Sequence, residues 1–126
     1  MRSASSLLAL LVVLNGAAAA DEPAGHVRFL VQSSPLAGFR YHAAAEVWSE
    51  LRVGDRLELV REPDNPYDAA AVSVSWRGRR LGYVPRRQNA AVAWALDRGE
   101  RLQARISRLR EHPNPARRME LEVFLE

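Results

Sequence analysis

Hydrophobic and polar residues alternate along several short segments of this chain, and this period of two is typical of half-buried β-strands. The clearest case is 71–76 (AVSVSW), where Val72, Val74 and Trp76 share one face. The predicted strands are 26–32, 56–60, 71–76, 80–84, 101–109 and 119–125. Short strands at this spacing, in a chain of 126 residues, predict a small β-barrel that is closed or partly open.

Two further segments have hydrophobic residues at helical rather than strand spacing. Residues 43–51 (AAAEVWSEL) form the first, and 90–96 (AAVAWAL) form the second, with Asn89 suited to cap its start and Gly99 to end it. The expected fold is therefore mainly β with about six strands and two short helices. The large aromatic residues at periodic positions are expected in its core; they are Trp48, Trp76, Trp94 and Phe124.

The first twenty residues have the order of a secretory signal peptide. Arg2 provides the positive start, 7–14 (LLALLVVL) is an apolar run too short to span a bilayer, and 18–20 ends in an A-x-A site. A frayed N-terminal helix would leave this order unexplained. We therefore expect a signal peptide over 1–20 with cleavage near Ala20, an unstructured lead-in over 21–25 and a domain over 26–126. The protein would be exported, periplasmic or secreted, with no membrane association in its mature form.

Composition excludes several kinds of chemistry. The chain has no cysteine, so disulfides, thiolate catalysis and cysteine–zinc sites are ruled out. Its three histidines are widely separated, and the spacing of Asp64, Asn65 and Asp68 fits no calcium loop, so neither a metal nor a cofactor is expected. No serine stands in a nucleophile motif. We expect a binding domain rather than an enzyme.

The positive charge is unevenly distributed. Every basic side chain is arginine, and without Arg2 the chain carries 17 arginines against 15 acidic residues, a net charge of +2. No acid occurs between Asp68 and Asp97, whereas five arginines do: Arg77, Arg79, Arg80, Arg86 and Arg87. This segment predicts either an electropositive face or edge, or a hairpin tip whose arginines serve only solubility.

The loop between two predicted strands, 61–72 (REPDNPYDAAAV), is unusually restricted. Pro63 and Pro66 each fix the backbone and push the preceding residue into an extended conformation. Asn65 and Asp68 can form turns by hydrogen bonding to backbone two residues ahead. Either the loop is a rigid turn whose Tyr67 packs over the barrel end and whose Asp68 bonds neighbouring amides, or it presents both side chains to a ligand.

Four segments together resemble the HIRAN domain. They are GFRYH at 38–42, LRVGDRLELV at 51–60, REPDNPYDAAAV at 61–72 and LGYVPRRQNAAVAWALDRG at 81–99. The resemblance covers nearly the whole chain after the predicted signal peptide, and is to the stand-alone bacterial type. It implies a small OB-like β-barrel that binds single-stranded DNA and captures a 3′-hydroxyl end. In multidomain relatives, Swi/Snf-type DNA translocases, ATP hydrolysis belongs to other domains and is not carried over.

The resemblance also implies roles for individual residues. Arg40 would contact a phosphate, Tyr41 would stack on a base, and Tyr67 would stack on the terminal base. Asp68 would accept a hydrogen bond from the terminal hydroxyl. The full set that the resemblance implies is Arg40, Tyr41, His42, Asn65, Tyr67, Asp68, Tyr83 and Arg86.

Three functions remain open from the sequence. The first is a HIRAN-type module for single-stranded DNA or other nucleic acid, and the second is an exported, non-enzymatic domain that uses the same pocket for a peptide, glycan or protein partner. The third, a metal-independent hydrolase, lacks a visible nucleophile–base pair.

Overall fold

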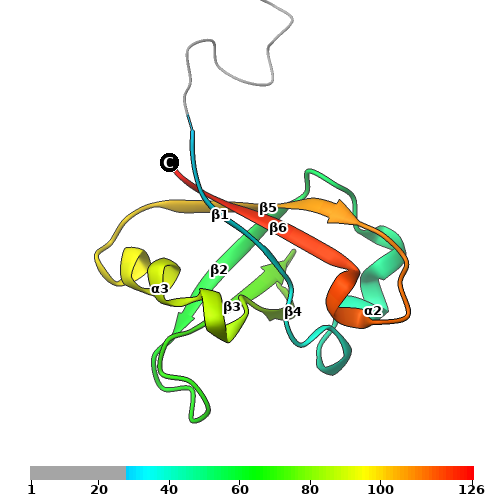
Figure 1. Cartoon of the computed structure of the whole chain (residues 1–126), viewed down its shortest axis with the longest axis horizontal. Coiled ribbons are helices and arrows are strands. Elements are labelled where there is room, and N and C mark those ends of the chain that lie inside the picture. Colours follow the sequence, from blue (N-terminus) through cyan, green and yellow to red (C-terminus); the bar gives the residue numbers. More distant parts are fainter. Residues whose placement is uncertain (1–27) are drawn as a thin grey trace, which may run out of the picture.

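Six antiparallel strands form the framework of the protein in the computed structural model, which describes residues 28–126 (Figure 1). The predicted signal peptide, the lead-in and the first two residues of the first predicted strand lie outside these residues. The strands are β1 (Phe29–Pro35), β2 (Arg56–Glu62), β3 (Ala71–Trp76), β4 (Arg79–Tyr83), β5 (Leu102–Leu109) and β6 (Met119–Leu125). Their order in the sheet is β1-β6-β5-β2-β3-β4.

The ladder of strands is not closed into a complete barrel, because β1 and β4 are its two edges. One isolated bridge joins the chain just after β1 to the end of β4: the Ala37 amide donates to the Tyr83 carbonyl at 2.8 Å, and the Tyr83 amide donates to the Ala37 carbonyl at 2.9 Å. The bridge makes the sheet a partly open, OB-like barrel, as predicted.

Within residues 28–126, two short α-helices and four 3₁₀ turns complete the fold. The helices are α2 (Ala44–Val47) and α3 (Ala90–Asp97), and the turns are η2 (Phe39–Tyr41), η3 (Trp48–Glu50), η4 (Arg86–Gln88) and η5 (Pro115–Arg117). In Figure 1, α3 and the loop between β2 and β3 lie at one end of the molecule, and α2 lies at the other. No helix among the described residues is long and apolar enough to span a membrane.

The core is formed by the inward faces of the central strands, since alternate residues of a strand point to the same side. Val72, Val74 and Trp76 of β3 are buried as the alternation predicts. The other large residues that are almost fully buried are Leu36, Leu81, Val84, Val92, Ile106, Met119, Leu121 and Val123. The core expected from periodicity is thus largely confirmed.

The prediction of Trp94 as a core residue is wrong: its side chain is 67% exposed on α3. Helix α3 buries Val92, Ala93 and Ala95, so Trp94 lies on the side turned to solvent. A tryptophan in an apolar run of only seven residues, 90–96, can belong to either face, and the run carries no polar residue to mark the outer one. Trp76 and Phe124 are buried, and Trp48 is partly buried against the core.

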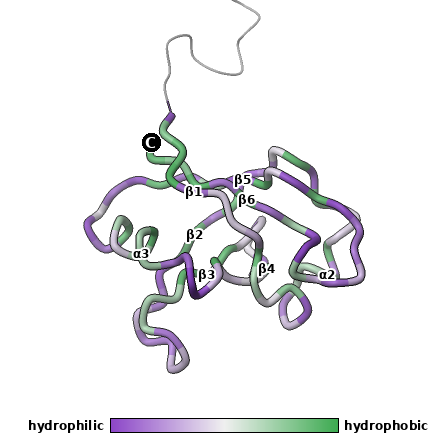
Figure 2. The backbone as a smooth tube through the Cα atoms, viewed as in Figure 1, coloured by the Kyte–Doolittle hydropathy of each residue, from purple (hydrophilic) through white to green (hydrophobic). Residues whose placement is uncertain are grey.

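The first strand lies three residues later than predicted, at Phe29–Pro35, and its start is not half-buried. Phe29, Leu30 and Val31 are all exposed. The cause is that β1 is an edge strand with a bulge between Leu30 and Gln32, which interrupts the alternation of sides. Figure 2 shows this hydrophobic start of β1 beside the hydrophobic end of β6, with which it pairs.

Candidate functional site

The loop between β2 and β3 is held by hydrogen bonds from its own side chains. The Asn65 Oδ1 accepts from the Tyr67 amide at 2.9 Å, and the Asp68 Oδ1 accepts from the Ala70 amide at 2.9 Å. Both turns predicted from the sequence are thereby confirmed. Tyr67 does not pack over the barrel end, because its side chain is 84% exposed.

Asp68 also ties this loop to the start of α3. Its Oδ2 accepts from the Asn89 Nδ2 at 2.8 Å, and Asn89 itself is buried. The predicted helix cap at Asn89 is therefore wrong in its detail, since this side chain bonds Asp68 rather than the helix backbone. The Ala70 amide, followed by Asn89 and the nearby Arg86, holds the pKa of Asp68 below its ordinary value despite some desolvation.

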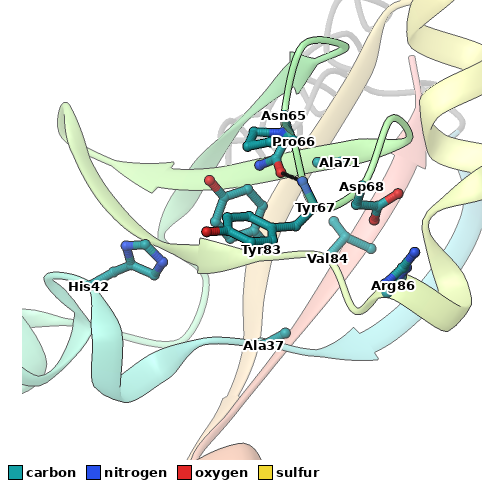
Figure 3. Close-up of a pocket in the computed structure, with 10 residues that line it drawn as sticks. All are labelled: Ala37, His42, Asn65, Pro66, Tyr67, Asp68, Ala71, Tyr83, Val84 and Arg86. Atoms are coloured by element: carbon teal, nitrogen blue, oxygen red, sulfur yellow. Dashed lines mark hydrogen bonds between the residues drawn. The ribbon is translucent and has the colours of Figure 1, made fainter.

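A hollow of about 440 Å³ opens between this loop, the end of β4 and the residues that flank the η2 turn; we call it the main hollow (Figure 3). In Figure 3, His42 lies at one end and Arg86 at the other, with Tyr67 and Tyr83 between them. Its lining residues are Ala37, His42, Asn65, Pro66, Tyr67, Asp68, Ala71, Tyr83, Val84 and Arg86. Six of the eight residues proposed from the sequence therefore border one cavity.

A carboxylate that sequence reasoning missed lies behind this hollow. Glu62 ends β2, and its Oε1 accepts from the Tyr83 hydroxyl at 2.8 Å and from the Asn65 Nδ2 at 3.1 Å. Its Oε2 accepts from the Arg80 guanidinium at 2.8 Å. Only the cross-strand pairing of β2, β3 and β4 brings these groups together, so no local pattern could have identified Glu62.

The Glu62 contacts shift two acid–base equilibria. Desolvation raises the pKa of Glu62, but hydrogen bonds from Tyr83 and Asn65 together with Arg80 outweigh it, so the pKa lies below its ordinary value. Desolvation, and then the hydrogen bond to the Glu62 carboxylate, raise the pKa of Tyr83. At neutral pH Glu62 is thus a charged acceptor, and Tyr83 is a neutral donor.

His42 forms the aromatic end of the main hollow. Its ring meets the Tyr83 ring edge-on, with the centroids 5.5 Å apart. Desolvation, followed by the positive charge of Arg80, lowers the pKa of His42, while Glu62 opposes the shift. The imidazole is therefore neutral at pH 7 and can stack, donate one hydrogen bond or accept one.

Arg40 and Tyr41 do not line the main hollow. They border a separate, smaller hollow of about 200 Å³, here called the second hollow, together with Gly38, Phe39, Asn114, Pro115 and Ala116. Tyr41 is 77% exposed there. Residues 114–116 belong to the connection between β5 and β6, and sequence reasoning did not assign them to the site. This connection contains an Asn-Pro pair, as the loop at Asn65–Pro66 does. The pair was the one sequence signal that could have assigned the connection to the site.

The arginines divide into two groups by their partners. Arg79 pairs with Glu46 at 2.6 Å and Arg80 pairs with Glu62 at 2.8 Å, so the predicted five-arginine segment does not form a single unpaired face. Within residues 28–126, Arg86 and Arg87 form no ion pair, and neither do Arg40 and Arg117. Arg86 borders the main hollow, and Arg40 borders the second.

The site provides aromatic faces, acceptors and guanidinium groups, but no ligand set for a metal. Among residues 28–126, no three His, Cys, Asp or Glu side chains gather closely enough to hold an ion. The arrangement can stack planar groups, accept hydrogen bonds and attract anions at its margins.

The comparisons with known proteins agree on one family. The family model of the HIRAN domain matches residues 29–126. Helicase-like transcription factor of Mus musculus is 33% identical over 78 residues, and that of Oryctolagus cuniculus is 32% identical over 78 residues. Each alignment covers 61% of this chain but only 7% of the relative, so the chain spans a small part of those proteins.

Two crystal structures resemble the described fold. A protein from Lactobacillus plantarum superposes with a TM-score of 0.68 at 30% identity, covering 79% of this chain and 95% of that one. The HIRAN domain of human HLTF superposes with a TM-score of 0.59 at 22% identity, covering 78% of each chain. The second likeness supports the fold alone.

Proposed function

This chain belongs to the HIRAN domain family, and from that premise we propose that it binds single-stranded nucleic acid, preferably DNA, and holds its 3′-hydroxyl end in the main hollow. Family membership supports a nucleic-acid-binding module. The observation that carries the finer proposal is the single cavity bordered by Tyr67, Tyr83, Asp68 and Arg86.

The main hollow suits a terminal nucleotide in size and chemistry. Its lining combines the rings of His42, Tyr67 and Tyr83 with a few polar groups. Stacking of a base on an aromatic side chain contributes about 1–3 kcal/mol and tolerates any base. Tyr67, being largely exposed, is the ring that a base can reach most easily.

Acceptors and cations are placed at different points of this surface. Asp68 accepts one hydrogen bond on each carboxylate oxygen from the protein, and each oxygen has a further lone pair for a terminal hydroxyl. Arg86 at the main hollow and Arg40 at the second hollow can each attract a backbone phosphate. Tyr41 would stack on a base farther from the end.

Fluorescence anisotropy with short labelled single strands tests this proposal. We expect binding that weakens with added salt and that is stronger for a free 3′-hydroxyl than for a 3′-phosphate. Arg101→Gln is the control, because this arginine borders neither hollow. Equal binding of both ends would exclude end capture and leave general nucleic-acid binding, whereas no binding would exclude the whole proposal.

The predicted signal peptide favours a second candidate, in which the protein is exported and the main hollow takes a peptide, glycan or protein partner. Aromatic rings with nearby acceptors also suit a sugar ring. Both candidates are binding functions without catalysis. N-terminal sequencing of the mature protein from cell fractions tests export; an intact Met1 in the cytoplasm would contradict it.

A further inference from the structure

Glu62 contacts the walls of the main hollow without lining it. Its side chain is only 20% exposed, and it accepts hydrogen bonds from Tyr83 and Asn65, which both border the cavity. Arg80 accounts for the other carboxylate oxygen. The carboxylate is therefore bonded to two residues of the hollow wall, Tyr83 and Asn65, and to Arg80, which offsets its negative charge.

An ionised carboxylate can only accept hydrogen bonds, and this fixes the direction of each bond. The Tyr83 hydroxyl must donate its proton to Glu62, so Tyr83 can offer a ligand only the lone pairs of its oxygen. Glu62 also fixes the orientation of Asn65: one Nδ2 hydrogen goes to Glu62 and the Oδ1 accepts from the Tyr67 amide, which leaves the second Nδ2 hydrogen as a donor. Asp68 on the other wall is also an acceptor.

From these directions we propose that Glu62 is a specificity-determining residue. Because the Tyr83 hydroxyl donates to Glu62, it can only accept from a ligand. The main hollow therefore favours a terminal group that donates a hydrogen bond, such as a hydroxyl, over a terminal phosphate. This inference rests on the proposed function, since it concerns which strand end the hollow takes. Glu62 acts through Tyr83 and is a positioning residue.

Without the negative charge of Glu62, the Tyr83 hydroxyl no longer has to donate its hydrogen to residue 62. In Glu62→Gln the amide keeps nearly the same shape, but its NH₂ group can donate to Tyr83. The Tyr83 hydroxyl can then rotate and donate to a ligand oxygen. Discrimination against a phosphate end should weaken, whereas stacking on Tyr67 remains.

The first test needs no ligand. The pKa of Tyr83 is raised, first by desolvation and then by Glu62, so Glu62→Gln should lower it toward the ordinary value of 10.0. Absorbance titration in a Tyr41→Phe, Tyr67→Phe background isolates Tyr83, since the chain has 3 tyrosines. An unchanged titration in Glu62→Gln would overturn the inference, and circular dichroism at each pH establishes that the fold persists.

The second test measures the ratio of Kd values for oligonucleotides with 3′-phosphate and 3′-hydroxyl ends. A hydrogen bond that involves a charged group changes affinity by about tenfold or more. We expect Glu62→Gln to reduce the ratio about tenfold. Glu46→Gln is the matched control, because Glu46 also pairs with an arginine of β4 but borders neither hollow.

The outcomes separate this inference from the proposed function. If the wild-type protein binds no oligonucleotide, the proposed function fails. If it binds and discriminates, but Glu62→Gln keeps the same ratio, the inference alone fails. Tyr83→Phe serves if Glu62→Gln does not fold: this variant removes the acceptor itself, and it should weaken binding of the hydroxyl end more than that of the phosphate end. An equal effect on both ends would overturn the inference.

Discussion

Tyr67 and Asp68 are adjacent in one loop but differ in how much the protein already uses them. Asp68 accepts from the Ala70 amide and the buried Asn89 side chain, so it stabilises the loop and anchors α3. Tyr67 has no side-chain hydrogen bond among the described residues and is almost fully exposed. Substitution of Tyr67 should therefore affect binding alone, whereas substitution of Asp68 should also affect stability.

Tyr67→Ala should weaken binding of a single strand by about 1–3 kcal/mol, because one stacking face is removed. The melting temperature should change little, since the ring buries almost no surface. Anisotropy and thermal denaturation measure the two effects. Tyr67→Phe keeps the stacking face and should bind nearly as the wild type; a large loss of stability in Tyr67→Ala would show that the ring supports the loop instead.

Asp68→Ala should lower the free energy of unfolding by about 1–3 kcal/mol, because it leaves the buried Asn89 amide without its acceptor. Chemical denaturation measures the change. Asp64→Ala is the control in the same loop, since Asp64 is exposed and forms no side-chain hydrogen bond within residues 28–126. Equal stability of both variants would contradict the anchoring role.

Acid should destabilise the protein through Glu62 and Asp68. Their folded-state pKa values lie below the ordinary 4.5 and 3.8, so the unfolded chain binds protons first as the pH falls. The stabilisation is present above the ordinary values and is lost as the pH drops through the lowered ones. Urea denaturation between pH about 7 and about 3 should show a shallower loss for Glu62→Gln than for Glu46→Gln. Equal slopes would contradict this account.

At the scale of elements, the closing bridge between the chain after β1 and the end of β4 depends on Gly82. A side chain at this position would overlap the Ala37 carbonyl oxygen and crowd Leu36. The bridge brings Ala37 against Tyr83, and both residues line the main hollow. Close approach of two backbones here thus shapes the site.

Gly82→Ala should lower the free energy of unfolding by about 1–3 kcal/mol, because the added methyl group forces the two segments apart. Hydrogen exchange should show the Ala37 and Tyr83 amides losing protection. Gly78→Ala is the comparison: its φ of 79° strains the hairpin turn, but nothing lies within 4 Å of the new methyl group. Retained protection in Gly82→Ala would contradict the closing role.

The elements that could be predicted from the sequence are those with local signals. The hairpin of β3 and β4 has clear alternation in 71–76 and a tight turn at Arg77–Gly78. Helix α3 ends at Asp97, and Gly99 just past its end has a φ of 82°, as expected. The shifted β1 and the exposed Trp94 could not be predicted, because edge pairing, bulges and the choice of helix face depend on distant contacts. The position of Asp68 in the site could be predicted because its loop has a local motif. The hydrogen bonds of Glu62 could not, because they depend on contacts between distant strands.

At the scale of the whole molecule, the small net charge of +3 cannot by itself attract a polyanion strongly, so the placement of the arginines matters more than their number. An arginine that forms an ion pair has its positive charge largely offset by the carboxylate of its partner. Arg40 borders the second hollow and Arg86 the main one, and neither forms an ion pair within residues 28–126. Consecutive residues connect the two hollows: 38–41 border the second hollow and His42 borders the main one. Under the proposed function, we therefore expect a strand to run from one hollow to the other.

Neutralising Arg40 and Arg86 should therefore weaken binding far more than neutralising two paired arginines. In Arg40→Gln, Arg86→Gln, the slope of log K against log salt concentration should fall by about 0.7 for each phosphate that the protein no longer neutralises. The control is Arg79→Gln, Arg98→Gln, which removes the same charge from residues that pair with Glu46 and Glu100. If both double variants reduce the slope equally, binding follows total charge and no track joins the two hollows. A selective effect, with the melting temperature unchanged, would mean that the arginines at the two hollows bind the strand more strongly than arginines that pair with an acid.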